Sequence, residues 1–101
     1  MQETLEAVSS PRRREILRLV WDDELPSRAI AAHFDVTWQA ISHNLRVLRD
    51  AGLVSERRQG TQRLYRADRD KLGPLEAFLK EMWRHDLDTL DRVIDRDRGK
   101  A

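Results

Sequence analysis

The amino-acid sequence predicts a mainly α-helical domain that carries one small β-hairpin. Three observations lead to this prediction. Apolar residues recur at three- and four-residue steps over much of the chain, a glycine-centred turn near residue 60 separates two short strand-like segments, and an apolar stripe runs through residues 70–97. A chain of 101 residues suits a single domain with a modest core. We expect one domain over residues 1–101, with its core in residues 5–69.

Four helices are expected before the hairpin. Leu5 and Val8 indicate a short first helix, and Ser10 followed by Pro11 is typical of the start of the second. The third helix is short and is expected to begin near Pro26 and Ser27. The apolar residues that suit the core in these two helices are Ile16, Leu17, Leu19, Val20, Ala29, Ile30 and Phe34.

The fourth predicted helix carries two different faces. Thr37 is placed to cap its first turn, and Gly52 can end it by adopting a positive φ. Ile41, Leu45 and Leu48 have the spacing of a buried face. The other face holds Trp38, Gln39, Ser42, His43, Arg46 and Arg49. A face of this composition suggests contact with another molecule.

A basic hairpin is expected after the fourth helix. The stretch "LVSERRQGTQRLYRA" indicates two short strands around Gln59-Gly60-Thr61. Arginines surround this turn at Arg57, Arg58, Arg63 and Arg66. The charge is local: residues 36–69 hold seven arginines and three acidic residues, a net charge of +4, whereas the whole chain carries +1. A localised anionic partner would be attracted to this segment.

A long last helix is expected over residues 70–97, with its true start near Gly73-Pro74. A continuous helix of about 25 residues spans close to 40 Å, which exceeds the diameter expected for so small a domain. The domain itself can cover Leu75 and Leu79 but is expected to leave Trp83, Leu87, Leu90 and Ile94 poorly covered, so the apolar stripe predicts a homodimer. The predicted dimer residues are Leu5, Val8, Leu75, Leu79, Met82, Trp83, Leu87, Leu90 and Ile94.

The third and fourth helices together indicate a helix-turn-helix that reads double-stranded DNA. The second helix of such a pair packs inward while it presents hydrogen-bonding side chains to base edges in the major groove. The hairpin would act as a wing that reaches backbone phosphates or the adjoining minor groove. The predicted DNA-binding residues are Thr37, Trp38, Gln39, Ser42, His43, Arg46, Arg49, Arg58, Thr61 and Arg63.

Over residues 5–79 the sequence resembles the ArsR-type winged helix-turn-helix regulators. The segments "SSPRRREILRLV", "ELPSRAIAAHFDVTWQAISHNLRVLRDAGLV" and "ERRQGTQRLYRAD" are similar to that family's second helix, helix-turn-helix and wing, in order and spacing. The resemblance implies a dimeric transcriptional regulator, usually a repressor. Its first and last helices would form the dimer interface, a two-stranded wing would follow the fourth helix, and the fourth helix would read a partly palindromic operator.

Two positions depart from the family's pattern. The family commonly has Ser-X-His-Leu in its recognition helix, whereas Ser42-His43-Asn44-Leu45 stands here. The family's metal sensors place cysteines after an "EL" pair, and this chain has Pro26 and Arg28 in "ELPSRA". No thiolate metal site is therefore expected. His85 with Asp88 and Asp91 has too few ligands at poor spacing, so we expect no metal and no cofactor.

Other function classes fit the sequence less well. The chain has no cysteine and no cluster of carboxylates or histidines suited to catalysis, so we do not expect an enzyme. It lacks a signal peptide and any apolar segment long enough to cross a membrane, which predicts a cytoplasmic protein. The alternative is a protein-interaction module that uses the long last helix and has lost DNA reading. A small-molecule effector is left open by the sequence.

Overall fold

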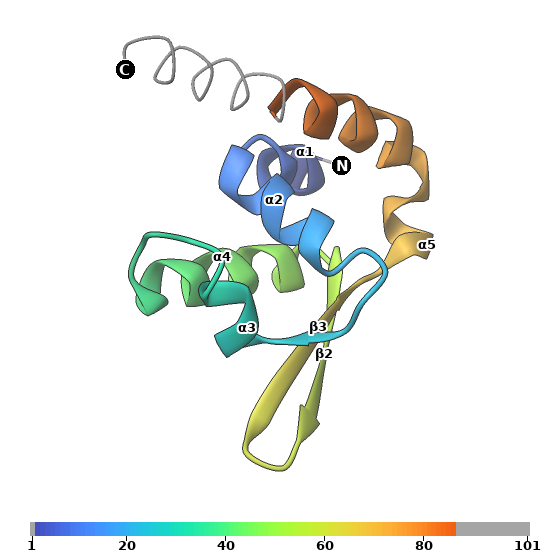
Figure 1. The fold of residues 1–101 in the computed structure, drawn as a ribbon. Coiled ribbons are helices and arrows are strands. Elements are labelled where there is room, and N and C mark those ends of the chain that lie inside the picture. Colours follow the sequence, from blue (N-terminus) through green and yellow to red (C-terminus); the bar gives the residue numbers. More distant parts are fainter. Residues whose placement is uncertain (1, 87–101) are drawn as a thin grey trace, which may run out of the picture.

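The computed structural model describes residues 2–86 (Figure 1). Their order is α1 (Gln2–Val8), α2 (Pro11–Leu19), β1 (Leu25–Pro26), α3 (Ser27–Ala31), α4 (Trp38–Asp50), β2 (Val54–Gln59), β3 (Gln62–Ala67), α5 (Arg69–Leu72) and the 3₁₀ turn η1 (Gly73–Leu75). Residues 76–86 are helical and continue the chain after η1. The mainly helical class, with the four helices α1–α4 before the hairpin, is as predicted.

Local signals in the sequence set the ends of the helices. The Ser10 hydroxyl accepts a hydrogen bond from the Arg13 amide at 3.3 Å, with Pro11 at the first position of α2. α4 ends in a Schellman motif, in which the Gly52 amide donates to the Arg49 carbonyl and the Leu53 amide donates to the Leu48 carbonyl, both at 2.9 Å. This motif needs a left-handed residue after the helix, and Gly52 has φ +78°.

The sheet has three strands, in the order β1-β3-β2, where we expected only two. The missed strand is β1, which pairs antiparallel with β3 through Leu25↔Tyr65 and Pro26↔Leu64. A two-residue strand has no alternating pattern to detect, and a proline is confined to sheet edges because it cannot donate to a ladder. The wing itself is two-stranded as predicted, because β2 pairs with β3 alone over residues 54–67.

The hairpin turn is as tight as the sequence indicates. Gln59 pairs with Gln62, so that only Gly60 and Thr61 lie between the strands. Gly60 has φ +63°, the requirement for the first central position of a type II′ turn. Figure 1 shows that the hairpin projects from the side of the molecule opposite α1 and residues 76–86.

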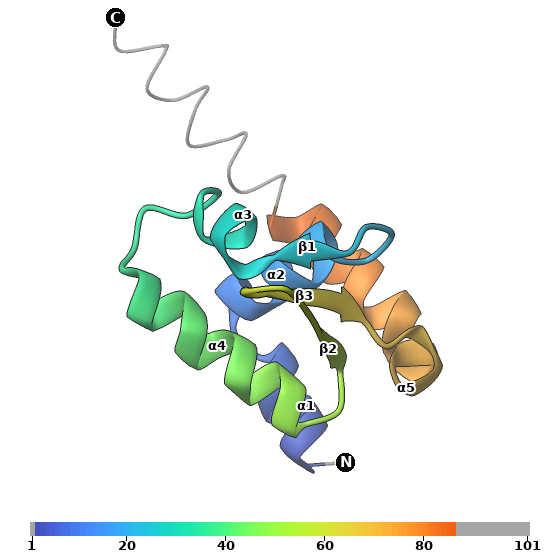
Figure 2. The same ribbon diagram turned by 90° about the horizontal axis from the view of Figure 1, so that it is seen from below.

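The core lies between α2, α4 and the helix that follows η1. Its fully buried large side chains are Val8, Ile16, Leu17, Val20, Ile30, Ile41, Leu45, Leu48, Leu53, Leu72 and Leu79. The view from below in Figure 2 places β3 between β1 and β2, with α4 and α5 on opposite sides of the hairpin. Among the described residues, no helix combines the length and the apolar character of a membrane span.

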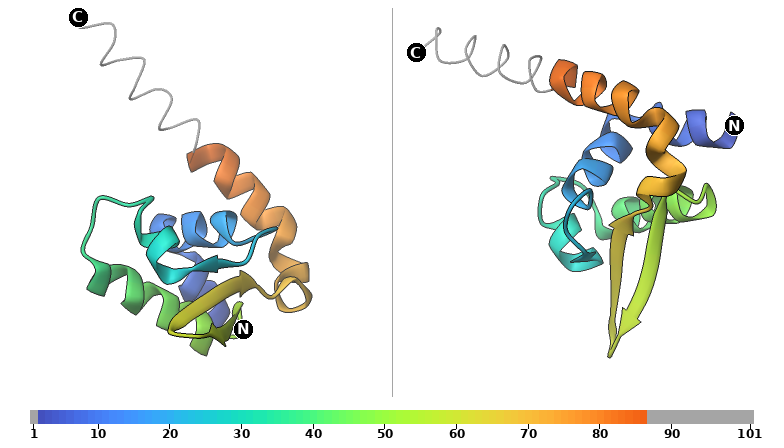
Figure 3. Two further views of the ribbon diagram at one scale, coloured as in Figure 1. Left: turned by 60° about the horizontal axis from the view of Figure 1, so that its bottom comes forward. Right: turned by 90° about the vertical axis from the view of Figure 1, so that its right-hand side faces the viewer.

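The C-terminal helix docks on its own domain more closely than we predicted. Trp83 is only 9% exposed, because its ring packs edge-on against Trp21 at 5.2 Å and its Nε1 donates to the Arg14 carbonyl at 2.7 Å. The buried Arg14 side chain donates to both carboxylate oxygens of Asp86, at 3.2 and 3.3 Å. Both views in Figure 3 show this helix lying across the end of the domain.

The expectation that the domain leaves Trp83 poorly covered is therefore wrong, whereas the assignment of Val8, Leu79 and Trp83 to a dimer interface stays a prediction. All three side chains are buried within the protomer and belong to its core cluster, in which Trp21 packs against Trp83. Leu75 and Met82 are partly buried, whereas Leu5 is 50% exposed. The remaining predicted dimer residues, Leu87, Leu90 and Ile94, lie outside the described residues.

Candidate nucleic-acid interface

The polar face of α4 is exposed along its whole length. The Thr37 hydroxyl accepts a hydrogen bond from the Ala40 amide at 3.1 Å and so fixes the start of the helix. The Trp38 side chain is 57% exposed, an unusual position for so large an apolar group. Gln39, His43, Arg46 and Arg49 are exposed and Ser42 is half-buried, so the residues predicted for one face lie on one face.

Asn44 lies on the inner side of α4 and is buried. Its Nδ2 donates to the Ala40 carbonyl at 2.9 Å, and its Oδ1 accepts from Arg13 Nη1 at 3.2 Å. Arg13 also donates to the carbonyls of Glu6 and Ala7. The departure from Ser-X-His-Leu at this position therefore joins α4 to α1 and α2 and does not alter the exposed face.

The wing carries two arginines whose mutual repulsion lowers its stability. Arg58 and Arg63 stand directly opposite each other in the register of β2 and β3, an arrangement that costs free energy when both side chains carry the same charge. Both are exposed, and Thr61 lies beside them at the hairpin tip. An anion bound at the wing would relieve this repulsion.

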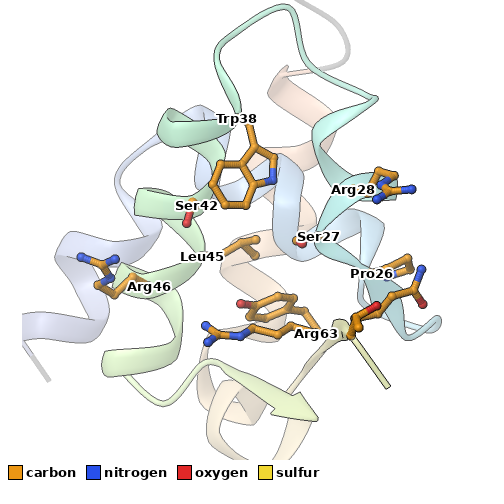
Figure 4. A pocket seen from close by; sticks show the side chains of 11 residues that line it. Pro26, Ser27, Arg28, Trp38, Ser42, Leu45, Arg46 and Arg63 are labelled. Carbon is orange, nitrogen blue, oxygen red and sulfur yellow. The ribbon is translucent and has the colours of Figure 1, made fainter. Parts of the chain in front are cut away.

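An open groove of about 640 Å³ separates α4 from β3 and the start of α3. Figure 4 shows Trp38, Ser42 and Arg46 along α4, Ser27 and Arg28 on α3 across the groove, and Arg63 of β3 at the lower side. Tyr65 and Thr61 complete the lining together with Pro26, Leu45 and Gln62. The groove thus brings five of the predicted DNA-binding residues together: Trp38, Ser42, Arg46, Thr61 and Arg63.

Sequence reasoning missed Arg28, Ser27 and Tyr65 at this groove. Arg28 was noted only as a departure from a cysteine motif, and Ser27 only as a helix start. Arg28 could have been predicted from its positive charge and from its position at the start of the helix-turn-helix. No sequence signal placed Tyr65 there, because its position depends on the pairing of β3 with β1.

Carboxylates hold several of the basic side chains near α4. Glu56 accepts from Arg49 Nη1 at 3.0 Å, and Glu24 accepts from Arg57 Nε at 3.1 Å. The hydrogen bond that Arg57 donates lowers the pKa of Glu24, and the hydrogen bond that Arg49 donates to Glu56 raises the pKa of Arg49. Among residues 2–86, by contrast, no carboxylate lies within 4.0 Å of Arg28, Arg46 or Arg58. These three arginines are available to an external anion.

Two other surfaces bear on the predicted partners. Phe78 is 43% exposed on the C-terminal helix. It is not among the dimer residues predicted from the sequence, although Leu5 is.

Within residues 2–86, no three histidine, aspartate or glutamate side chains gather as a metal site. Asp88 and Asp91 lie outside the described residues.

Comparison with known proteins agrees with this geometry. Residues 10–56 match the model of the bacterial regulatory protein, arsR family. The transcriptional repressor SdpR of Bacillus subtilis is 37% identical over 60 residues, which cover 59% of this chain and 67% of that protein. The HTH-type transcriptional regulator Rv2034 of Mycobacterium tuberculosis is 30% identical over 92 residues, which cover 91% of this chain and 86% of that protein.

Solved structures with this fold include regulators of the same kind. The crystal structure of a possible transcriptional regulator for arsenical resistance has a TM-score of 0.69 and 38% identity, covering 93% of this chain and 95% of that one. The solution structure of a homodimeric winged helix-turn-helix DNA-binding domain from Mycobacterium bovis has a TM-score of 0.71 and 30% identity, covering 87% and 82%. The predicted winged helix-turn-helix architecture is thereby confirmed.

Proposed function

The chain belongs to the ArsR family of bacterial regulatory proteins, and we propose that it represses transcription by binding double-stranded DNA as a homodimer. One observation carries the proposal. The exposed face of α4 and the wing meet at a groove whose lining includes Arg28 and Arg46, two arginines with no carboxylate within 4.0 Å among residues 2–86. The repressor named SdpR and the homodimeric DNA-binding domain from Mycobacterium bovis support it. The protein acts by binding, not by catalysis, in the cytoplasm.

In the proposed complex α4 enters the major groove. Gln39, Ser42, His43 and Arg46 offer hydrogen-bonding groups to base edges, and an arginine can bind guanine O6 and N7 together. Trp38 would contact a sugar or a thymine methyl at the start of the helix. Thr37 caps the helix and so orients these residues. Two copies of α4 related by a two-fold axis would meet major grooves one helical turn apart.

The groove between α4 and the wing would receive one sugar-phosphate strand. When a helix lies in the major groove and a hairpin reaches the adjoining minor groove, a single backbone strand must pass between them. Arg46 and Arg63 belong to the two walls of the groove, and Arg28 of α3 contributes to its lining. Arg58 and Thr61 at the hairpin would contact the minor groove or its phosphates, which would relieve the Arg58–Arg63 repulsion.

The first test is selection of a binding site from a random-duplex library, followed by anisotropy titrations of the selected duplex. We expect two chains per site and an affinity that falls steeply with salt, because phosphate contacts release counterions. Arg46→Ala should weaken binding to the selected site by about 5- to 150-fold, the equivalent of about 1–3 kcal/mol for a base contact. Ser42→Ala should relax sequence preference at one base pair.

Arg84→Ala is the matched control, because Arg84 is an exposed arginine on the C-terminal helix and is not part of the groove lining. It should leave DNA affinity unchanged. Retained affinity in Arg46→Ala would refute the contact assignment. A wild-type protein that sediments as a monomer and binds no duplex in a salt-dependent way would refute the proposed function and favour the protein-interaction alternative.

Tryptophan quenching gives a second measurement on the same complex. Of the three tryptophans, Trp21 and Trp83 are buried and Trp38 is exposed, so acrylamide quenching reports mainly on Trp38. DNA binding should protect this fluorescence if the start of α4 enters the groove. Unchanged quenching in a saturated complex would place α4 away from the DNA.

A further inference from the structure

Glu56 lies where the end of α4 meets the base of the wing, and its carboxylate is shared by three side chains. Oε2 accepts from Arg49 Nη1 at 3.0 Å and from the Tyr65 hydroxyl at 3.1 Å. Oε1 lies 4.0 Å from Arg63 Nε. The side chain is 23% exposed, and Glu56 stands directly opposite Tyr65 in the sheet. One carboxylate thus joins α4, β2 and β3.

This arrangement divides the predicted DNA-binding arginines into two groups. Arg49 and Arg63 each have the Glu56 carboxylate within 4.0 Å. Arg46 and Arg58 have no such neighbour among residues 2–86. The Glu56 carboxylate offsets the positive charge of both guanidinium groups, through a hydrogen bond from Arg49 and through charge attraction to Arg63 at 4.0 Å, so that each attracts a phosphate less strongly. Arg49 and Arg63 therefore contribute less to phosphate binding than their positions suggest.

The effect on the two kinds of DNA complex is unequal. A non-specific complex depends almost entirely on arginine–phosphate attraction, whereas a specific complex also depends on base contacts. Neutralising two cations at the interface therefore weakens the non-specific complex by the larger fraction. The base contacts assigned to Ser42 and Arg46 are left intact, because neither side chain touches Glu56 in the described contacts.

We infer that Glu56 is a specificity-determining residue that lowers the affinity of this protein for non-cognate DNA. Its carboxylate offsets the charge of Arg49 and Arg63, fixes the wing against α4 through Arg49, and joins the two wing strands through Tyr65. This inference rests on the proposed DNA-binding function. Glu56 is an acidic residue inside the basic segment, where its charge opposes the attraction of that segment for DNA.

The protonation equilibria agree with this geometry. Partial burial opposes ionisation of Glu56, but the hydrogen bonds from Arg49 and Tyr65 and the charges of Arg49 and Arg63 lower its pKa on balance. Burial and the hydrogen bond to Glu56 raise the pKa of Tyr65. The carboxylate is therefore ionised at neutral pH, and the tyrosine keeps the proton that it donates.

Glu56→Gln tests the inference because it removes the charge and keeps the shape. Its binding to a random-sequence duplex is compared with that of the wild type over a range of salt concentrations. Release of one or both arginines should steepen the slope of log affinity against log salt by about 1–2. Affinity for random DNA should rise several-fold, and the ratio of selected-site to random affinity should fall.

Glu81→Gln provides the matched control. Glu81 accepts from Arg84 at 3.0 Å in an exposed ion pair on the C-terminal helix, so this variant makes the same change in net charge away from the interface. Its slope and its specificity ratio should equal those of the wild type. If Glu81→Gln and Glu56→Gln have equal slopes, net charge alone explains the effect and the inference is wrong.

A second readout needs no DNA. Tyr65 is the only tyrosine in the chain, so tyrosinate absorbance titrates a single residue. Glu56→Gln should lower its pKa, with circular dichroism recorded in parallel to show that the fold persists. An unchanged tyrosine pKa, or an unchanged salt slope in a variant that still binds, would overturn the inference alone. Wild-type protein that binds no duplex would overturn the proposed function as well.

Discussion

Trp83 provides the sharpest test of how the C-terminal helix is held. Its indole Nε1 donates to the Arg14 carbonyl at 2.7 Å and its ring meets Trp21 edge-on at 5.2 Å. Trp83→Phe removes the hydrogen bond, worth about 0.5–1.5 kcal/mol, and about 1 kcal/mol of apolar burial. Together the free energy of unfolding should fall by about 2 kcal/mol. Trp83→Ala should lower it by about 3–5 kcal/mol, a large share of the 5–15 kcal/mol typical of a small domain.

Thermal denaturation followed by circular dichroism measures this loss. A change of 2 kcal/mol in a domain of this size lowers the Tm by about 8–16 °C. The protomer concentration must be held constant, because dimerisation would make the Tm depend on it. Trp38→Phe is the matched control, since the same substitution at a 57% exposed side chain should change the free energy of unfolding by less than about 0.5 kcal/mol.

A double-mutant cycle isolates the aromatic pair. Trp21→Leu and Trp83→Leu, alone and together, should show a coupling of about 0.5–1.5 kcal/mol, the range for edge-on aromatic pairs. Additive losses, or a Trp83→Phe variant as stable as Trp38→Phe, would refute the idea that Trp83 anchors the C-terminal helix. In that case the helix would depend on Leu79 and the Arg14–Asp86 pair.

Three further predictions concern local structure. Gly52→Ala should destabilise the protein by about 1 kcal/mol or more, because its φ of +78° disfavours a side chain and the added Cβ would lie 3.1 Å from Lys71 Nζ. Gly60→Ala should cost less, because Gly60, at φ +63°, has open space around it. Urea denaturation of both variants measures the difference. Thr37→Ala should cost about 1 kcal/mol while Thr37→Ser retains the cap, checked by the same assay. Because the folded-state pKa of Glu56 is lowered, its contribution is present above the unfolded pKa of about 4.3 and is lost as pH falls through the folded value. Wild type should therefore exceed Glu56→Gln in stability near pH 6 and lose this advantage below about pH 4; a constant difference across that range would contradict the argument.

Helical periodicity predicted the recognition helix because burial there follows a local rule. Ile41, Leu45 and Leu48 face inward and Trp38 faces outward, as 3.6 residues per turn requires. The same rule failed for Trp83. Spacing shows that a stripe is apolar but not what covers it, and the covering residue, Trp21, lies far away in the sequence.

The sequence predicted which elements carry the arginines of the candidate site, but not which of these arginines pair with carboxylates. The sequence indicated four arginines on α4 and on the wing, and the structure places two of them, Arg46 and Arg63, in the lining of one groove. Which of them pair with carboxylates depends on how the hairpin lies against α4. Glu56 reaches Arg49 because β2 starts four residues after α4 ends, and Glu24 reaches Arg57 because β1 adds a strand beside β3. Neither contact leaves a pattern in the sequence.

Two adjacent arginines relate the recognition helix to the opposite end of the molecule. The last carbonyls of a helix have no partner within it, and those of α1 accept hydrogen bonds from Arg13 and Arg14. Arg13 also donates to Asn44 on the buried side of α4, and Arg14 also donates to Asp86 on the C-terminal helix. The end of α1 is therefore a common point of attachment for both helices. Since a dimer formed through α1 and the C-terminal helix must hold two copies of α4 at one fixed spacing, these contacts connect the predicted dimer surface to the face of α4 that we propose reads DNA.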